Sequence, residues 1–292
     1  MRRVSVRLCR LALGSESLVE HLRHPTMPGA DVFLVGTAHV SQASADQVFD
    51  VVRAVRPKHV VVELCDARLQ RLIERGKHPG NGGGMREAIL RAFQIPGADN
   101  AGRVFAGGIG ALYEVLRAAG MDPGADMLAG VEAGKEVGAE VICGDVPFAE
   151  TVGQLRAELF GTDLPALAAA LERSDVQQDV DALGLGSMDL LGLLAGDASA
   201  TKKLSLVVER LKDRQHVRRL VRIVDDAAPK LARVLLHERD AALAAALRDG
   251  PVSCGPAVCV VGLAHMDGIA RRYCDPGWVC NAELGSSSGS RN

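Results

Sequence analysis

Aromatic side chains are scarce in this sequence, which has one Trp, two Tyr and six Phe among 292 residues. A core with so few rings must be built from aliphatic side chains, and a hydrophobic share of 48% is enough for a substantial one. A strong net charge is also lacking, because the formal value is −2. That balance gives no general attraction to nucleic acid or acidic membranes, so we expect no nucleic-acid partner.

Long apolar runs are missing as well, since nothing approaches the roughly 18 residues that a membrane-spanning helix needs. The longest stretches, 104–116 and 183–195, are rich in glycine and interrupted by acidic residues. The first 15 residues contain four Arg and no acid, a composition compatible with an organelle transit segment, whereas Arg7 and Arg10 interrupt any secretory signal. We expect a soluble, intracellular protein of the cytoplasm, a mitochondrion or a plastid, neither secreted nor membrane-spanning.

The seven cysteines form no C-x-x-C pair. Several lie in apolar runs, so we expect small buried side chains in a reducing compartment. Cys254, Cys259, Cys274 and Cys280 have spacings loosely compatible with a thiolate metal site. That alternative is less favoured, because structural zinc sites use closer pairs.

Continuous apolar runs predict strands that are buried on both faces, as in parallel sheets. They lie at 32–35, 59–64, 141–143 and 257–261. Between the first two, residues 44–55 carry an apolar stripe at helical spacing, so this strand–helix–strand order predicts a parallel pair with a right-handed crossover. A helix followed by a strand is expected again over 123–145.

Residues 151–250 contain no convincing strand, and their apolar residues recur at intervals of three and four. This spacing predicts a helical layer inserted before the last strand. The basic run 202–222 has apolar residues interleaved with it, which favours a solvated helix face over a phosphate-binding patch. The predicted fold class is α/β, with a mixed, largely parallel sheet.

The usual catalytic signatures are absent, because the chain has no G-x-S-x-G elbow, no H-E-x-x-H and no Walker A loop. It has instead two Gly-x-Ala-His motifs, at 36–39 and 262–265, each directly after an apolar strand, while Glu63 ends a third strand. Ligands bind at the carboxyl edge of parallel sheets, so His39, Glu63 and His265 converge there if their strands are neighbours. Two imidazoles and a carboxylate are a familiar ligand set for a divalent metal, although each is equally compatible with an ordinary surface or hydrogen-bonded role.

Five segments, in order, resemble the TraB family in the form of its eukaryotic TraB-domain proteins. They are VFLVGTAHVSQAS (32–44), VVVELCDARLQRL (60–72), PGADMLAGVEAGKEVGAEVICGD (123–145), LLHERDAALAAAL (235–247) and VVGLAHMDGI (260–269). The resemblance implies a domain over 31–272, with its helical region at about 151–250. Residues 1–30 would then be an N-terminal extension and 273–292 a disordered tail.

The TraB family is related to the pheromone-shutdown proteins and to the Tiki metalloproteases, and resembles a wider group with the erythromycin esterases and the haem-binding ChaN proteins. The resemblance implies a sheet of that type, with His39, Glu63 and His265 as catalytic or metal-binding positions and Mn, Co or Zn as the metal. It implies no separate cofactor site. Polar residues at matching motif positions would orient the ligands, namely Arg68, Asp145, Glu238, Arg239 and Asp240.

The sequence departs from the family pattern in three ways. Val146 follows the Gly-Asp turn where relatives have Arg, a helical position that is usually Glu is Asp126, and the relatives' membrane spans are absent. Since Val146 removes a cation beside Asp145, we predict that Arg239 binds that carboxylate. The alternative is that Arg239 pairs with an acidic neighbour on its own helix.

The leading functional hypothesis is a metal-dependent, peptidase-like hydrolase acting on a peptide or small molecule, with Glu63 as metal ligand or general base. One alternative is a non-catalytic regulatory protein that binds a peptide or cofactor, since TraB proteins are associated with restraining a peptide pheromone. Another is an organelle-associated adaptor that docks through its helical layer. The substrate, the metal and the oligomeric state stay open.

Overall fold

The computed structural model describes residues 18–24, 27–38, 42–77, 124–160, 172–184, 197–248 and 255–275, with single positions at 165, 169–170, 186 and 192. Its centre is a five-stranded sheet in the order β1-β2-β5-β3-β4. The strands are β1 (Val19–Leu22), β2 (Val32–Thr37), β3 (His59–Val62), β4 (Glu140–Cys143) and β5 (Ala257–Gly262). All neighbours are parallel except β1 and β2, so the predicted α/β class with a mixed, largely parallel sheet is confirmed.

The last strand of the sequence occupies the middle of the sheet. β5 pairs with β2 on one side and with β3 on the other, so that Leu34, Cys259 and Val61 lie in one row. Every residue of β2, β3 and β5 is buried, as expected of continuous apolar strands that are covered on both faces. This order makes the three predicted strands neighbours and brings their carboxyl ends to one edge.

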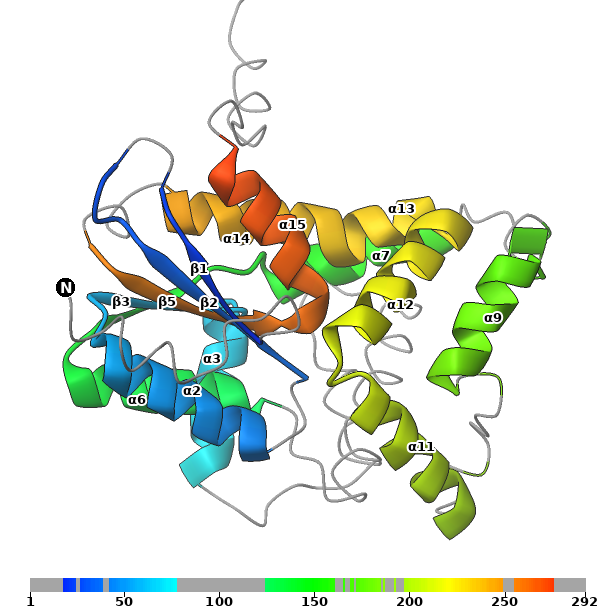
Figure 1. Cartoon of the computed structure of the whole chain (residues 1–292), viewed down its shortest axis with the longest axis horizontal. Coiled ribbons are helices and arrows are strands. Elements are labelled where there is room, and N and C mark those ends of the chain that lie inside the picture. The colour runs from blue at the N-terminus through cyan, green and yellow to red at the C-terminus, as the bar shows by residue number, and fades with distance from the viewer. Residues whose placement is uncertain are drawn as a thin grey trace, which may run out of the picture.

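Helices cover both faces of the sheet (Figure 1). On one side α2 (Gln42–Val55) and α6 (Ala125–Val137) pack over the strands. A Cβ at Gly134 would lie 3.0 Å from Val60, and one at Gly130 would lie 3.1 Å from Val260, so these glycines let α6 approach the sheet closely. α3 (Asp66–Lys77) follows β3 directly and begins beside the carboxyl edge.

The other face is covered by helices that come from the last third of the chain. α14 (Glu238–Arg248) and α15 (Leu263–Cys274) share a buried cluster with β2 and β5, and Val217 of α12 joins them. α15 starts immediately after β5, which places the first turn of this helix, including His265, at the carboxyl edge.

The predicted helical layer precedes β5. It consists of α7 (Phe148–Phe160), α9 (Ser174–Leu183), α11 (Ala198–Arg210), α12 (Arg214–Ala227), the short α13 (Pro229–Ala232) and the π-helix η2 (Arg233–His237), followed by α14. The side chains of Asp197 and Asp213 cap the first turns of α11 and α12. Within the described ranges, no helix has the length and apolar character needed to cross a bilayer.

β1 was not predicted from the sequence. It lies inside the segment expected to be an N-terminal extension, and it is hydrogen-bonded to β2 along its whole length. The predicted tail is described only as far as Asp275, and residues 1–17 and 276–292 lie outside the described part of the chain.

Candidate functional site

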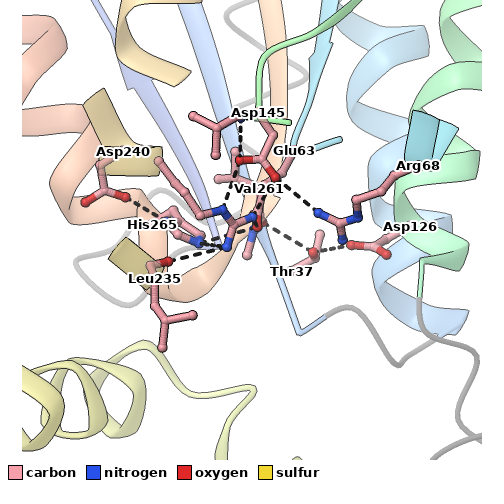
Figure 2. Close-up of polar contacts among 12 residues, drawn as sticks. Thr37, Glu63, Arg68, Asp126, Asp145, Leu235, Asp240, Val261 and His265 are labelled. Atoms are coloured by element: carbon pink, nitrogen blue, oxygen red, sulfur yellow. Dashed lines mark hydrogen bonds and ion pairs between the residues drawn. The ribbon is translucent and has the colours of Figure 1, made fainter. Parts of the chain in front are cut away.

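Five polar side chains from four separate segments meet at the carboxyl edge of the sheet. We call them the buried polar cluster: Glu63 directly after β3, Asp145 after β4, Arg239 and Asp240 in α14, and His265 in α15. Figure 2 shows Glu63, Asp145 and His265 pointing toward one another from different elements. The structure thus brings two of the three predicted metal-site residues together. The third, His39, lies outside the described residues.

Glu63 ties β3 to the end of β5. Its Oε2 accepts a hydrogen bond of 2.7 Å from the backbone N–H of Gly262, the glycine of the second Gly-x-Ala-His motif. Its Oε1 accepts a hydrogen bond from Nη2 of Arg239 and lies 3.4 Å from Nε2 of His265. Since Oε2 is committed to the backbone, Oε1 is the atom that faces the centre of the cluster.

Asp240 binds the Nδ1 side of the His265 ring. The distance from Nδ1 to Asp240 Oδ1 is 2.7 Å, and Oδ2 of the same carboxylate lies 3.4 Å from Nη1 of Arg272. This arrangement places the ring proton on Nδ1 and directs Nε2 at Glu63. A carboxylate behind a histidine is the usual way in which proteins orient a histidine for metal binding or proton transfer.

The protonation of His265 depends on competing neighbours. Burial by itself lowers the pKa of the ring, but the charge of Glu63 and the hydrogen bonds to Asp240 and Glu63 outweigh it and raise the pKa to about 9. In the neutral ring, Nε2 accepts from Nη1 of Arg239 at 3.2 Å, because a guanidinium has only donors. In the protonated ring, Nε2–H is 3.4 Å from Oε1 of Glu63.

Arg239 is the cation at the centre of the cluster. Its Nε and Nη2 form a fork with Asp145, at 2.9 and 2.8 Å, and Nη2 also donates to Glu63. Nη1 lies 3.4 Å from the carbonyl oxygen of Leu235 and 3.2 Å from His265. Burial lowers the pKa of Arg239, but the charges of Glu63 and Asp145 outweigh that effect and raise the pKa above its ordinary value.

The predicted pairing of Arg239 with Asp145 is therefore confirmed, and the alternative within its own helix is wrong. Asp240 turns toward His265 instead. Glu238, which was predicted to support the site, binds Arg233 away from the buried polar cluster, and Arg233 also binds Glu158. Packing of α14 against the sheet explains this division, because only one side of the helix faces the carboxyl edge.

Asp145 is a buried carboxylate that accepts hydrogen bonds from two arginines and one backbone N–H. Besides the fork from Arg239, its Oδ2 accepts from Nη1 of Arg68 at 3.1 Å, and its Oδ1 accepts from the N–H of Val146 at 2.9 Å. The side chain is only 2% exposed. Arg68 and Arg239 thus supply the positive charge that the sequence lacks at position 146.

Thr37 and Asp126 form a second polar contact at the same edge, which the sequence analysis did not identify as part of the site. The hydroxyl of Thr37 donates to Oδ2 of Asp126 in the first turn of α6, and also lies 3.3 Å from the carbonyl oxygen of Val261. Both side chains are buried. The available signal was a polar residue inside an otherwise apolar strand end, within the first Gly-x-Ala-His motif.

The donor set fits a divalent ion in part. Glu63 Oε1 and His265 Nε2 are an oxygen and a nitrogen 3.4 Å apart, a separation compatible with one ion bonded to both at about 2 Å. Among the residues that the structure describes, no three His, Cys, Asp or Glu gather in a group that could hold a metal. A third ligand would have to come from outside the described ranges, where His39 lies.

The cysteine alternative finds no support at this edge. Cys259 is buried within β5, where burial raises the pKa of its thiol, and Cys274 is exposed at the end of α15. The other two candidates, Cys254 and Cys280, lie outside the described residues.

Comparison with known proteins finds a distant relative in an archaeon. No family model matches the chain. The sequence is 22% identical, over 241 residues, to an uncharacterized protein of Methanocaldococcus jannaschii, an alignment that covers 82% of this chain and 53% of the archaeal protein. The chain therefore spans about half the length of that relative. The name of this relative states no activity and no family, so the resemblance to the TraB family stays a prediction.

Proposed function

We infer that this protein is a metal-dependent hydrolase of the TraB type with peptidase-like chemistry. The observation that carries the proposal is the facing pair Glu63 Oε1 and His265 Nε2, 3.4 Å apart. Each partner is fixed through its other polar atom, Glu63 by the N–H of Gly262 and His265 by Asp240. Two donors held in this way are preorganised for a shared ion, because little conformational freedom is left to lose on binding.

The roles follow from the position of each side chain. A bound divalent ion would polarise a carbonyl group and lower the pKa of a water molecule. Glu63 and His265, with His39 as the proposed third donor, would hold the ion. Asp240 holds Nδ1 of His265 and so directs Nε2 toward Glu63; because the pKa of the ring is about 9, Nε2 would release a proton at neutral pH on binding the ion. Arg68, whose side chain is 31% exposed, is bound to Asp145 through Nη1 and would offer its other N–H groups to an oxygen of a peptide or small-molecule ligand.

A second candidate function is favoured by Arg239. Its guanidinium contacts both facing atoms, so the charge of Glu63 is compensated without any ion. A cluster satisfied in this way is compatible with a non-catalytic regulatory protein that binds a peptide at the same edge. This candidate requires no metal and predicts ligand binding without turnover.

Metal analysis separates the two candidates. We expect the purified chain to bind about one equivalent of Mn²⁺, Co²⁺ or Zn²⁺, and the ion to raise the melting temperature, because it would join β5 to β3 in the folded state only. His265→Gln, Glu63→Gln and His39→Ala should each abolish the shift. His216→Gln, a change of a half-buried histidine at the start of α12 and outside the buried polar cluster, is the matched control and should leave it unchanged. Equal shifts in all variants would mean that the ions act elsewhere and would favour the non-catalytic candidate.

A further inference from the structure

The buried polar cluster keeps its carboxylates inside and has guanidinium groups nearer to the surface. The side chains of Glu63, Asp145 and Asp240 are only 6%, 2% and 4% exposed. Arg239 is 15% exposed, and Arg68, in the first turn of α3, is 31% exposed. Of the charged side chains described in contact with the cluster, Arg68 is therefore the one that a ligand reaches most easily.

Arg68 is attached to the cluster by one end of its guanidinium (Figure 2). Its Nη1 donates to Oδ2 of Asp145 at 3.1 Å, and this is its only polar contact with the part of the chain that the structure describes. A guanidinium carries five N–H donors in a planar arrangement, so the side with Nε and Nη2 keeps its donors for another acceptor. Two parallel N–H groups on such a side match the two oxygens of a carboxylate.

Asp145 cannot be that second acceptor. Its oxygens already accept hydrogen bonds from Nε and Nη2 of Arg239, from Nη1 of Arg68 and from the N–H of Val146, which together use the lone pairs of one carboxylate. Arg239 is bound by a second carboxylate, that of Glu63, whereas Arg68 shares Asp145 alone among the described residues. Arg68 is thus fixed in position while its charge is only partly compensated.

The acidic residues near Arg68 limit the charge of an anion that could bind there. Asp66 is exposed in the same first turn of α3, and Asp126 is buried at the same edge of the sheet, in contact with Thr37. These carboxylates and Asp145 repel each further negative charge on a ligand. A singly charged carboxylate therefore fits this position better than a doubly charged phosphate.

We propose that Arg68 recognises a carboxylate, namely the terminal carboxylate of a peptide or of a small organic acid, through Nε and Nη2 while Asp145 holds Nη1. The inference rests on the proposed function in that a ligand binds at this edge, and it names the chemical class of that ligand. It requires no metal ion, because the donors are the N–H groups of one side chain. A ligand that ends in a carboxylate is bound, and the corresponding amide is discriminated against.

Titration calorimetry with a matched pair of probes tests the inference. N-acetyl-alanyl-alanine ends in a carboxylate, and N-acetyl-alanyl-alanine amide has nearly the same shape without the charge. Each is titrated into the full chain in the presence of EDTA, and inorganic phosphate is the third probe. We expect the wild type to bind the acid about tenfold more tightly than the amide, as one pair of charge-assisted hydrogen bonds predicts, and to bind phosphate more weakly than the acid.

Three variants assign the preference to Arg68. Arg68→Gln removes the charge and should weaken binding of the acid about tenfold, to the level of the amide. Arg68→Lys keeps the charge without the two parallel donors, so its affinity should lie between the two. Arg71→Gln is the matched control, because Arg71 is exposed one turn further along α3, and its affinity for the acid should equal that of the wild type. Circular dichroism confirms folding, and if Arg68→Gln does not fold, Arg68→Lys and the comparison of acid with amide still decide.

The outcomes are distinct from those of the metal analysis. A preference for the acid that is lost in Arg68→Gln and kept in Arg71→Gln would support the inference, even if the chain binds no divalent ion and the metal-dependent function fails. No binding of the acid, equal binding of acid and amide, tighter binding of phosphate, or an unchanged preference in Arg68→Gln would overturn it. An equal loss in Arg71→Gln would also overturn it, because the general charge of α3 would then explain the binding. A metal-dependent shift of the melting temperature would leave the proposed function standing in each of these cases.

Discussion

Arg239 and Asp145, which are 94 positions apart in the sequence, are joined by two parallel hydrogen bonds of 2.9 and 2.8 Å. The fork connects α14 to the turn after β4, and Nη2 extends it to Glu63 after β3. A single side chain thus links a helix on one face of the sheet to the carboxyl ends of two strands. Val146 supplies no positive charge to Asp145, and this charge comes instead from Arg239, which lies in a distant segment of the chain.

The first prediction concerns the stability that this fork provides. Arg239→Ala leaves Glu63 and Asp145 buried without their shared cation, so we expect a loss of about 3–5 kcal/mol in the free energy of unfolding. The double change Asp145→Asn with Arg239→Ala should cost less than the two single losses summed, because each single loss includes the same interaction. Urea denaturation measures all three. Strictly additive losses would contradict the coupling, and Arg53→Ala, in an exposed fork, should have a much smaller effect.

The second prediction concerns the support behind His265. A Cβ at Gly268 would overlap Oδ2 of Asp240 and push that carboxylate away from the imidazole ring. We expect Gly268→Ala to destabilise the fold by about 1–3 kcal/mol although alanine is the better helix former. Gly153→Ala is the control, because that glycine is also helical and a Cβ there meets nothing within 4 Å. The control should stabilise the protein by about 0.5–1 kcal/mol, and a similar gain in Gly268→Ala would refute the predicted displacement.

The third prediction is a pH dependence at Asp267. The hydrogen bond from Arg218, with further bonds and charge from Arg214, holds the pKa of this carboxyl below its usual value despite partial burial. A depressed pKa in the folded state means that Asp267 stabilises the fold above the unfolded pKa of about 3.9 and that this contribution is lost as pH falls through the folded value. We therefore expect Asp267→Asn to flatten the loss of stability below about pH 5.

Denaturation curves at several pH values measure this effect. Asp175→Asn is the comparison, because Asp175 has a lowered pKa in an exposed pair with Arg173. High salt should suppress the contribution of that exposed pair more than the contribution of Asp267. If the free energy of unfolding falls with decreasing pH equally in Asp267→Asn and in the wild type, the Asp267 ion pairs add nothing to stability.

The fourth prediction concerns the hydroxyl of Thr37. Thr37→Val keeps the shape of the side chain and removes its bond to Asp126, so a loss of about 1–3 kcal/mol is expected from the buried carboxylate. Thr37→Ser retains the hydroxyl and is the matched variant. Thermal melts at neutral pH compare the two, and a larger loss in Thr37→Ser would mean that the methyl group, not the hydrogen bond, matters here.

Most of the fold was predictable because its signals are local. The apolar runs at 32–35 and 257–261 became β2 and β5, and the stripe at 44–55 became α2, with ends displaced by one or two residues. β1 was missed because VEHL has only two apolar residues, at its ends and without alternation, and because its stability comes from pairing with β2. The π-helix before α14 was also unpredictable, since its spacing differs from an α-helix by one residue over a single turn.

The sequence by itself determined which residues end the buried strands, because apolar runs and glycines act over neighbouring positions. It placed Glu63 and the second Gly-x-Ala-His motif at carboxyl ends, and it marked Arg239 as the candidate partner of Asp145. Only the tertiary structure decided that β5 inserts between β2 and β3 and sets His265 beside Glu63. Strand order and helix rotation depend on how helices pack on both faces of the sheet at the same time. These contacts join segments that are far apart in the sequence, so no single segment predicts them.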